Sequence, residues 1–288
     1  MRRLWLITLV LIAAAFPARA ADRLNVVASF SILGDFVHNV GGDRVSVTTL
    51  VGPNSDAHVY APTPGDAKKI ADARLIFING LGFEGWLPRL VQSSGSKANV
   101  VTASASITPL RLGSHADPHA WQTVVNARTY VDNIRAALSA AAPVDAEVFK
   151  TNAEAYQEKL DALERDIRQW VGQTPRERRK VISNHDAFGY FAKAYDIEFI
   201  APVGVSTESE PSARDVANII TQIKKAKITA VFLENMGDPR LIERIAAETG
   251  VKVGGTLYSD SLTDEKGDAP TYIEMVRHNI KALRYALE

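Results

Sequence analysis

A long amphipathic run in the middle of the chain constrains the fold more than any other feature. After a break at Pro143, apolar side chains in residues 144–171 recur at the period of an α-helix over about seven turns. These apolar positions are Phe149, Ala153, Tyr156, Leu160, Leu163, Ile167 and Trp170 or Val171. A helix of this length spans roughly 40 Å, comparable to a whole small domain. We therefore predict a rigid connector between two parts of the molecule; the alternative is a helix that covers one sheet.

Strand and helix patterns alternate on both sides of this run. Before it, they fall at 23–30, 34–42, 45–51, 64–73, 74–80 and 85–93. After it, they fall at 180–184, 186–195, 197–200, 211–226, 228–234, 239–248, 251–255 and 270–287. Such alternation is typical of parallel sheets with functional loops at the strand ends. The predicted fold class is α/β, with two (βα)4-like lobes of mainly parallel sheets joined by one long rigid backbone helix. We place the lobes at 21–143 and 172–288, and the connecting helix at 144–171.

Residues 1–20 have the pattern of a cleavable secretory signal peptide. Arg2 and Arg3 precede an apolar stretch, and Ala-Arg-Ala at 18–20 is a small-residue cleavage site. Removal of this segment takes three arginines from a chain with 33 basic and 33 acidic residues, so no basic field remains to favour nucleic acid. The sequence has no cysteine, so neither a disulfide nor a cysteine-linked lipid is available. We expect a monomeric periplasmic protein that is not lipid-anchored.

Histidines and carboxylates are the candidates for chemistry, because the usual catalytic motifs are missing. The sequence has no cysteine, no G-x-S-x-G elbow, no P-loop and no dinucleotide-binding glycine motif after its first predicted strand. His58 and His185 each follow a predicted strand, one in each lobe, and Asp260 lies in a turn after the last strand. Each has a structural alternative: an exposed loop for His58, a helix start for His185 and local turn bonding for Asp260.

The stretch GSHADPHAW (113–121) contains two histidines four residues apart. On a helix, this spacing would place both on one face, where they could hold a metal. Pro118 disfavours helical geometry at Asp117, so we do not expect one continuous helix. Instead, we expect Asp117 to cap a helix that begins at Pro118, with His119 in its first turn and His115 in a flexible segment before it.

Together, His58, His119, His185 and Asp260 would supply three imidazoles and one carboxylate from two lobes. This set suits a d¹⁰ ion such as Zn²⁺. Four protein ligands leave no open position for a water nucleophile, which favours binding over hydrolysis. Because imidazole must be neutral to bind a metal, we expect affinity to fall as the pH drops through roughly 6.5.

At these residues the sequence resembles the periplasmic solute-binding proteins of zinc and manganese ABC transporters (cluster A-I, or solute-binding protein 9, family). The similarity covers essentially the whole chain after residue 20. It runs through GPNSDAHVYAPTPGDAKKIADARLIFINGLGFEGWL, DPHAW, ISNHDAFGYFAKAYDIEF and YSDSLTDEKGDAPTYIEMVRHNIKAL. The resemblance implies two α/β lobes joined by a rigid long helix, and His58, His119, His185 and Asp260 as the metal ligands.

The resemblance further implies a high-affinity zinc receptor that delivers Zn²⁺ to the membrane permease of an ABC-type importer. Manganese-type members tend to carry Glu where this chain has His185, and imidazole favours zinc over the harder Mn²⁺. A receptor for Mn²⁺ or Fe²⁺ is the alternative. A periplasmic metallochaperone is a further candidate partner.

The sequence differs from the zinc-specific members in one region, and it also allows an alternative function of another class. Zinc-specific members often carry a long His- and Asp-rich loop, whereas the corresponding region here, 95–118, is short, so His115 is at most an accessory in metal delivery. We expect no enzymatic activity. A periplasmic zinc hydrolase, with Glu208 or Glu210 as its base, is the alternative from another class.

Overall fold

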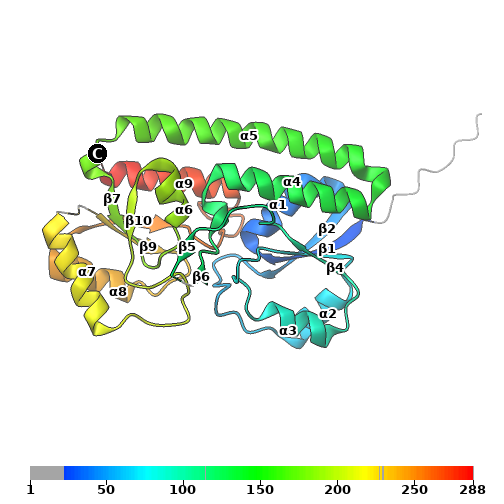
Figure 1. Ribbon diagram of the computed structural model, residues 1–288, viewed down its shortest axis with the longest axis horizontal. Helices are drawn as coiled ribbons and strands as arrows, with labels where there is room; N and C mark the ends of the chain where they lie inside the picture. Colours follow the sequence, from blue (N-terminus) through cyan, green and yellow to red (C-terminus); the bar gives the residue numbers. More distant parts are fainter. Residues whose placement is uncertain (1–22, 114, 227, 229, 288) are drawn as a thin grey trace, which may run out of the picture.

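The long helix α5 (Ala146–Gln173) crosses both halves of the molecule, and two α/β lobes lie side by side along it (Figure 1). The structure is a computed structural model that describes residues 23–113, 115–226, 228 and 230–287. The predicted fold class is confirmed. The predicted signal peptide, 1–20, lies outside the described residues.

The first lobe is built on a four-stranded parallel sheet in the order β2-β1-β3-β4. Its strands are β1 (Leu24–Phe30), β2 (Val45–Val51), β3 (Leu75–Ile78) and β4 (Asn99–Thr102). Its first helices are α1 (Ser31–Gly41), α2 (Pro64–Ala71) and α3 (Leu87–Ser94). Side chains alternate between the faces of a strand, so Val26 and Phe30 pack in the core that contains α1, while Val27 packs in the core that contains α2 and α3.

The second lobe repeats this topology in the order β10-β9-β7-β8, again all parallel. Its strands are β7 (Lys180–Ile182), β8 (Glu198–Ile200), β9 (Ala230–Glu234) and β10 (Lys252–Leu257). Its helices are α6 (Gly189–Tyr195), α7 (Ala213–Ala226), α8 (Arg240–Thr249) and α9 (Tyr272–Leu287). In both sheets the first strand of the lobe has the second on one side and the third on the other. Ligands of such sheets bind outside the carboxyl ends of the strands, where the winding direction reverses.

The core on the α5 side is shared by the two lobes. Apolar side chains of α5 are buried among α1 and α4 (Val124–Ala141) of the first lobe and among α6 and α9 of the second. Leu160, Leu163 and Ile167 are fully buried there. The helix begins two residues after the start of the predicted run because Pro143–Asp145 forms a 3-10 turn, and it ends at Gln173. Smaller cores fill the outer faces of the two sheets.

Several short elements were not predicted from the sequence. They are β4 and a hairpin of β5 (Arg111–Leu112) and β6 (His115–Ala116). His115 therefore pairs with Leu112 in a hairpin that was not expected, and the flexibility of this segment stays a prediction. Within the described part of the chain, no helix is both long enough and apolar enough to cross a membrane.

Candidate metal centre

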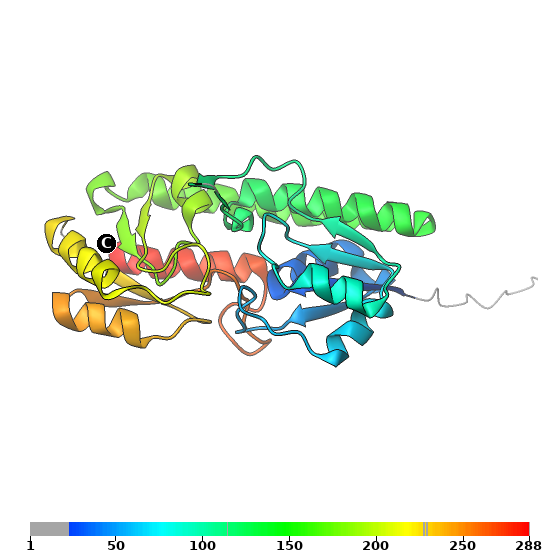
Figure 2. The ribbon, with the colours of Figure 1, turned by 60° about the horizontal axis from the view of Figure 1, so that its bottom comes forward.

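Loops at the carboxyl ends of the two sheets bring the four predicted ligands together. His58 lies in the loop after β2, and His119 immediately precedes a 3-10 turn (Ala120–Gln122). His185 follows β7, and Asp260 follows β10. One ligand atom from each residue can be chosen so that all four lie within 4.8 Å of one another, and all four residues are buried. The carboxyl ends of both sheets therefore meet at one point between the lobes (Figure 2).

The three imidazoles converge on one carboxylate oxygen. Asp260 Oδ2 lies 3.2 Å from His58 Nε2, 3.5 Å from His119 Nε2 and 3.1 Å from His185 Nε2. The Nε2 atoms of His58 and His119 are 3.3 Å apart. Ligand atoms that each lie about 2.0–2.2 Å from a tetrahedral Zn²⁺ are separated by about 3.3–3.6 Å. These four distances therefore fit one ion with four protein ligands.

One oxygen of the Asp260 carboxylate is available to bind a cation. Its Oδ1 atom is buried and has no hydrogen-bond partner among the described residues. Buried polar atoms are nearly always paired, so an unpaired carboxylate oxygen inside a histidine cluster is typical of a ligand for a positive ion.

Two further carboxylates stand behind the imidazoles. His119 Nδ1 lies 2.8 Å from Asp117 Oδ1, and His185 Nδ1 lies 2.7 Å from Glu234 Oε2. A proton held on each Nδ1 leaves the Nε2 lone pair facing the cluster, and such partners fix the ring orientation of metal-binding histidines. Glu234 Oε1 also accepts the backbone N–H groups of Asn184 and His185, each at 2.9 Å. Glu234 thus makes an ion-pair contact with the ring of His185 and accepts hydrogen bonds from its backbone and that of Asn184.

Sequence reasoning missed Glu234 and gave Asp117 the wrong role. The expected helix start at Asp117 is wrong, because α4 begins at Val124 after its cap Thr123. Asp117 Oδ1 instead accepts the backbone N–H of His119 at 2.9 Å as well as its Nδ1–H. The signal available for Glu234 was its place at the end of a predicted strand, because His58, His185 and Asp260 also follow predicted strands.

The buried carboxylates control the charge of the imidazoles. Burial lowers the pKa of His119, but the charge of Asp260 and the hydrogen bond to Asp117 outweigh this effect and raise it to about 9. Burial opposes the charged form of His185 too, but Glu234 and Asp260 hold its pKa well above the usual value. The pKa of Asp260 is well below its usual value because His119 and His185 offset its burial. In the metal-free protein, protons therefore compensate the carboxylates, and a bound cation would replace these protons.

His58 stands at the edge of the cluster. It is 8% exposed, whereas the other three candidate ligands are fully buried. Its backbone N–H donates to Asp56 Oδ1 at 2.8 Å, and Asp56 Oδ2 accepts the hydroxyl of Thr207 from the second lobe at 2.6 Å. The ring of Phe83 packs edge-on against it, with 4.7 Å between the ring centroids. A contact between the lobes therefore holds the backbone of the most accessible ligand.

His115 does not join the four clustered side chains. It is exposed on β6, and it lines a cavity of about 360 Å³ that also contains His58 and Glu208. This shared cavity is compatible with an accessory role in delivery, which stays a prediction.

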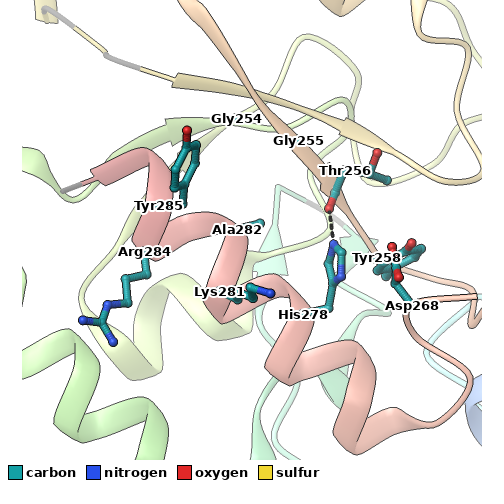
Figure 3. A pocket seen from close by; sticks show the side chains of 10 residues that line it. All are labelled: Gly254, Gly255, Thr256, Tyr258, Asp268, His278, Lys281, Ala282, Arg284 and Tyr285. Carbon is teal, nitrogen blue, oxygen red and sulfur yellow. Dashed lines mark hydrogen bonds between the residues drawn. The ribbon is translucent and has the colours of Figure 1, made fainter.

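A second cavity is separate from the cluster. It lies between β10 and α9, has a volume of about 690 Å³ and contains none of the four candidate ligands (Figure 3). His278 lines it, and its Nε2 atom lies 3.1 Å from the backbone oxygen of Thr256. This histidine is thus tied to the neighbouring strand.

The chain is similar in sequence and fold to known metal-binding proteins. The family model described as "Zinc-uptake complex component A periplasmic" matches residues 26–286. The chain is 35% identical over 271 residues to the iron-binding protein YfeA of Yersinia pestis (93% of this chain, 87% of the relative). It is 35% identical over 261 residues to the manganese-binding lipoprotein MntA of Halalkalibacterium halodurans (90% and 87%). The solved periplasmic zinc-binding protein TroA of Treponema pallidum superposes with a TM-score of 0.89 at 32% identity (92% and 99%).

Proposed function

Because the chain belongs to the family of the periplasmic zinc-uptake component A, and relatives include metal ABC transporter substrate-binding proteins, we propose that it is a zinc receptor. It binds Zn²⁺ through His58, His119, His185 and Asp260. It then delivers the ion to the membrane permease of an ABC-type importer. A periplasmic metallochaperone is a further candidate partner.

The chemistry of the four donor atoms is the reason for proposing zinc. The names of the relatives point to iron, manganese and zinc receptors, so they do not decide the metal. Three imidazole nitrogens and one carboxylate suit a tetrahedral Zn²⁺ better than Mn²⁺, which favours more oxygen ligands. The carboxylate oxygen lies 3.1–3.5 Å from the three nitrogens, and all four donors lie within 4.8 Å of one another. A receptor for Mn²⁺ or Fe²⁺ is the alternative.

Metal analysis of protein isolated from the periplasm without added metal tests this choice. Zinc should be the bound ion, and manganese or iron in its place would contradict the proposal. Because most protein sites prefer Zn²⁺ over Mn²⁺ to some degree, affinities are best compared with those of the His185→Glu variant. The ratio of zinc to manganese affinity should fall in that variant, because an oxygen donor replaces a nitrogen.

The ligand assignment is tested by the two histidines of GSHADPHAW. His119 lies in the cluster with its Nε2 atom facing Asp260, so His119→Ala should remove most of the zinc affinity. His115 lies on the hairpin outside the cluster, so His115→Ala should change the affinity little. Competition titration against a zinc chelator measures both. Equal losses in the two variants would refute the assignment.

In this proposal the protein is a receptor and not an enzyme. Four protein ligands leave a tetrahedral ion no open position for a nucleophilic water. A hydrolase would need Glu208 or Glu210 as its base; Glu208 lines the same cavity as His58, and Glu210 lines one with His185. Turnover of ester, phosphate or peptide substrates by the zinc-loaded protein, lost in Glu208→Gln, would favour the hydrolase.

We propose that the mature protein is a monomer that is free in the periplasm. The sequence contains no cysteine for lipid attachment, although the similar MntA is named a lipoprotein. Osmotic-shock fractionation should release it with soluble periplasmic proteins, and recovery with the membranes would contradict this location. Light scattering measures the mass, and a dimer would contradict the monomer.

A further inference from the structure

Asp35 joins three elements that belong to different parts of the molecule. It lies on α1 of the first lobe, and its Oδ2 atom accepts the backbone N–H of Tyr272, the first residue of α9, at 3.0 Å. The same oxygen accepts the hydroxyl of Tyr156 from α5 at 3.3 Å, and Oδ1 accepts the side-chain N–H of Asn39 at 3.0 Å. One carboxylate therefore contacts the first lobe, the connecting helix and the second lobe.

The contact with α9 has an electrostatic basis. The first N–H groups of a helix have no partner within the helix, and its amino end carries a partial positive charge. Thr271 supplies a local cap, because its hydroxyl oxygen accepts the N–H of Glu274 at 3.3 Å. The N–H of Tyr272 is paired instead with Asp35, 237 positions away in the sequence. A helix of the second lobe is thus capped by a carboxylate of the first.

The start of α9 also reaches the metal cluster. The hydroxyl of Tyr272 donates to the backbone oxygen of Trp121 at 2.7 Å. The side chains of Trp121 and Gln122 both donate to the backbone oxygen of Ser259, at 2.9 and 2.7 Å. Ser259 immediately precedes Asp260, and Trp121 lies two residues after His119. The hydrogen bonds from Asp35 therefore continue to residues that neighbour one candidate ligand from each lobe along the chain.

We propose that Asp35 is a positioning residue for metal binding, whose carboxylate between α1, α5 and α9 fixes the two lobes so that Asp260 meets the three imidazoles. Metal affinity falls in proportion to the fraction of metal-free protein that holds the lobes in this position. Loss of a charge at a helix end should weaken the apparent affinity about three- to thirtyfold. The effect on affinity rests on the proposed ligand set, whereas the effect on lobe position does not.

The charge of Asp35 changes within an accessible pH range. Burial raises its pKa to about 6, although the N–H of Tyr272, the hydroxyl of Tyr156 and the charge of His38 act in the opposite direction. The carboxylate is therefore charged at pH 7.5 and mostly neutral at pH 5. Facing it are His38 and Asn39 from α1, Tyr156 from α5 and the amino end of α9.

The lobe position is measured by the distance between two spin labels. The sequence has no cysteine, so Gln92→Cys on α3 and Gln222→Cys on α7, both exposed, place one label on each lobe. Asp35→Asn should broaden the distance distribution of the metal-free protein at pH 7.5, and Zn²⁺ should narrow it again. The zinc affinity should fall about three- to thirtyfold. Asp43→Asn, an exposed acid just after α1, is the matched control and should change neither quantity. A parent-like distribution in Asp35→Asn would overturn the proposal.

The parent protein provides a second measurement that needs no substitution of Asp35. Its distance distribution should broaden between pH 7.5 and pH 5 in the absence of metal, and it should do so equally in His38→Gln, where the nearby imidazole is removed. An unchanged parent distribution at pH 5, or a change that His38→Gln abolishes, would refute the role of Asp35. If the distances respond but zinc affinity does not, the lobe contact stands and the proposed ligand set fails.

Discussion

Glu234 holds His185 from two directions, so it is the side chain behind the ligands whose loss should be most informative. In Glu234→Gln the negative charge beside His185 Nδ1 disappears while the side chain keeps nearly the same shape. Loss of such a partner typically weakens metal binding about 10- to 100-fold. We expect a zinc affinity reduced by that factor, measured by chelator competition.

Glu243→Gln is the matched control for this substitution. Glu243 is exposed on α8, so the same chemical change there should leave the affinity unchanged. If Glu234→Gln binds zinc as tightly as the parent, the charge of Glu234 does not affect zinc binding by His185. Its hydrogen bonds would then only stabilise the backbone at Asn184 and His185.

The pH dependence of metal binding follows from the charge of His119. Its pKa, raised to about 9, lies above the unfolded value near 6.5, so zinc must displace protons at neutral pH. The decline in affinity should therefore begin near pH 9, well above the value of 6.5 expected from the sequence. The raised pKa stabilises the metal-free fold below about pH 6.5, and this contribution is lost as the pH rises through 9.

Titration calorimetry in buffers of different ionisation enthalpy measures the protons released at pH 7.5, and we expect at least about one per ion. Denaturant unfolding of the metal-free protein at pH 6.5 and 9 measures how much stability is lost as His119 loses its proton. Binding heats that do not depend on the buffer would show that the imidazoles are already neutral.

The candidate ligands could be predicted from the sequence, but the carboxylates behind them could not. His58, His185 and Asp260 stand out because each follows a predicted strand, and Pro118 separates His119 from His115. Glu234 lies 49 positions from His185, and the two meet only because β9 and β7 are neighbours in the sheet. Strand order is a property of the whole fold, so nothing local to Glu234 indicates its partner.

At the scale of single elements, the first residue of α6 must be small because of the metal site. A Cβ atom on Gly189 would lie 2.6 Å from Asp117 Oδ2, closer than such atoms approach in proteins. In most helices, Gly→Ala is stabilising by about 0.5–1 kcal/mol. Here the new methyl group should displace Asp117 from His119. We expect Gly189→Ala to weaken zinc binding roughly tenfold or more.

Gly172→Ala on α5 provides the comparison, because no atom lies within 4 Å of a Cβ built there. It should leave zinc affinity unchanged and raise the unfolding temperature slightly. Parent-like zinc affinity in Gly189→Ala would show that Asp117 adapts and that its contact with His119 does not depend on this glycine.

The long periodic elements were predicted well, and the short ones were not. Alternating or continuous apolar residues mark β1, β2 and α5 because these elements bury much of their surface. β4 is an edge strand with an exposed Val100, and β5 and β6 have two residues each. Such elements are stabilised by neighbouring strands or by a turn, so their own sequence carries little periodic signal.

At the scale of the whole molecule, the metal cluster depends on contacts that both lobes share. His58 and His119 come from the first lobe, His185 and Asp260 from the second, and one apolar core on the α5 side extends through both. We expect this shared core to place the ligands before the ion arrives, which would reduce the free-energy cost of binding. It also links the stability of each lobe to that of the other.

We therefore expect the metal-free protein to unfold in one cooperative transition, although it has two lobes. Trp86 lies in the first lobe, and Trp121 lies at its contact with Ser259 of the second. Trp170 lies at the far end of α5, beside Arg178 and Leu287 of the second lobe. Two variants separate these signals: Trp170→Phe, and the double variant Trp86→Phe, Trp121→Phe. In each variant, unfolding followed by fluorescence should have the same midpoint as unfolding followed by circular dichroism.

Zinc at about 100 times its dissociation constant should raise stability by about 2.7 kcal/mol. This corresponds to roughly 5–10 °C in unfolding temperature for a chain of this size. Because the candidate ligands come from both lobes, the fluorescence and circular dichroism transitions of each variant should shift together. Two separate transitions, or a shift confined to one lobe, would mean that the shared core does not couple the lobes and that the ion stabilises only one of them.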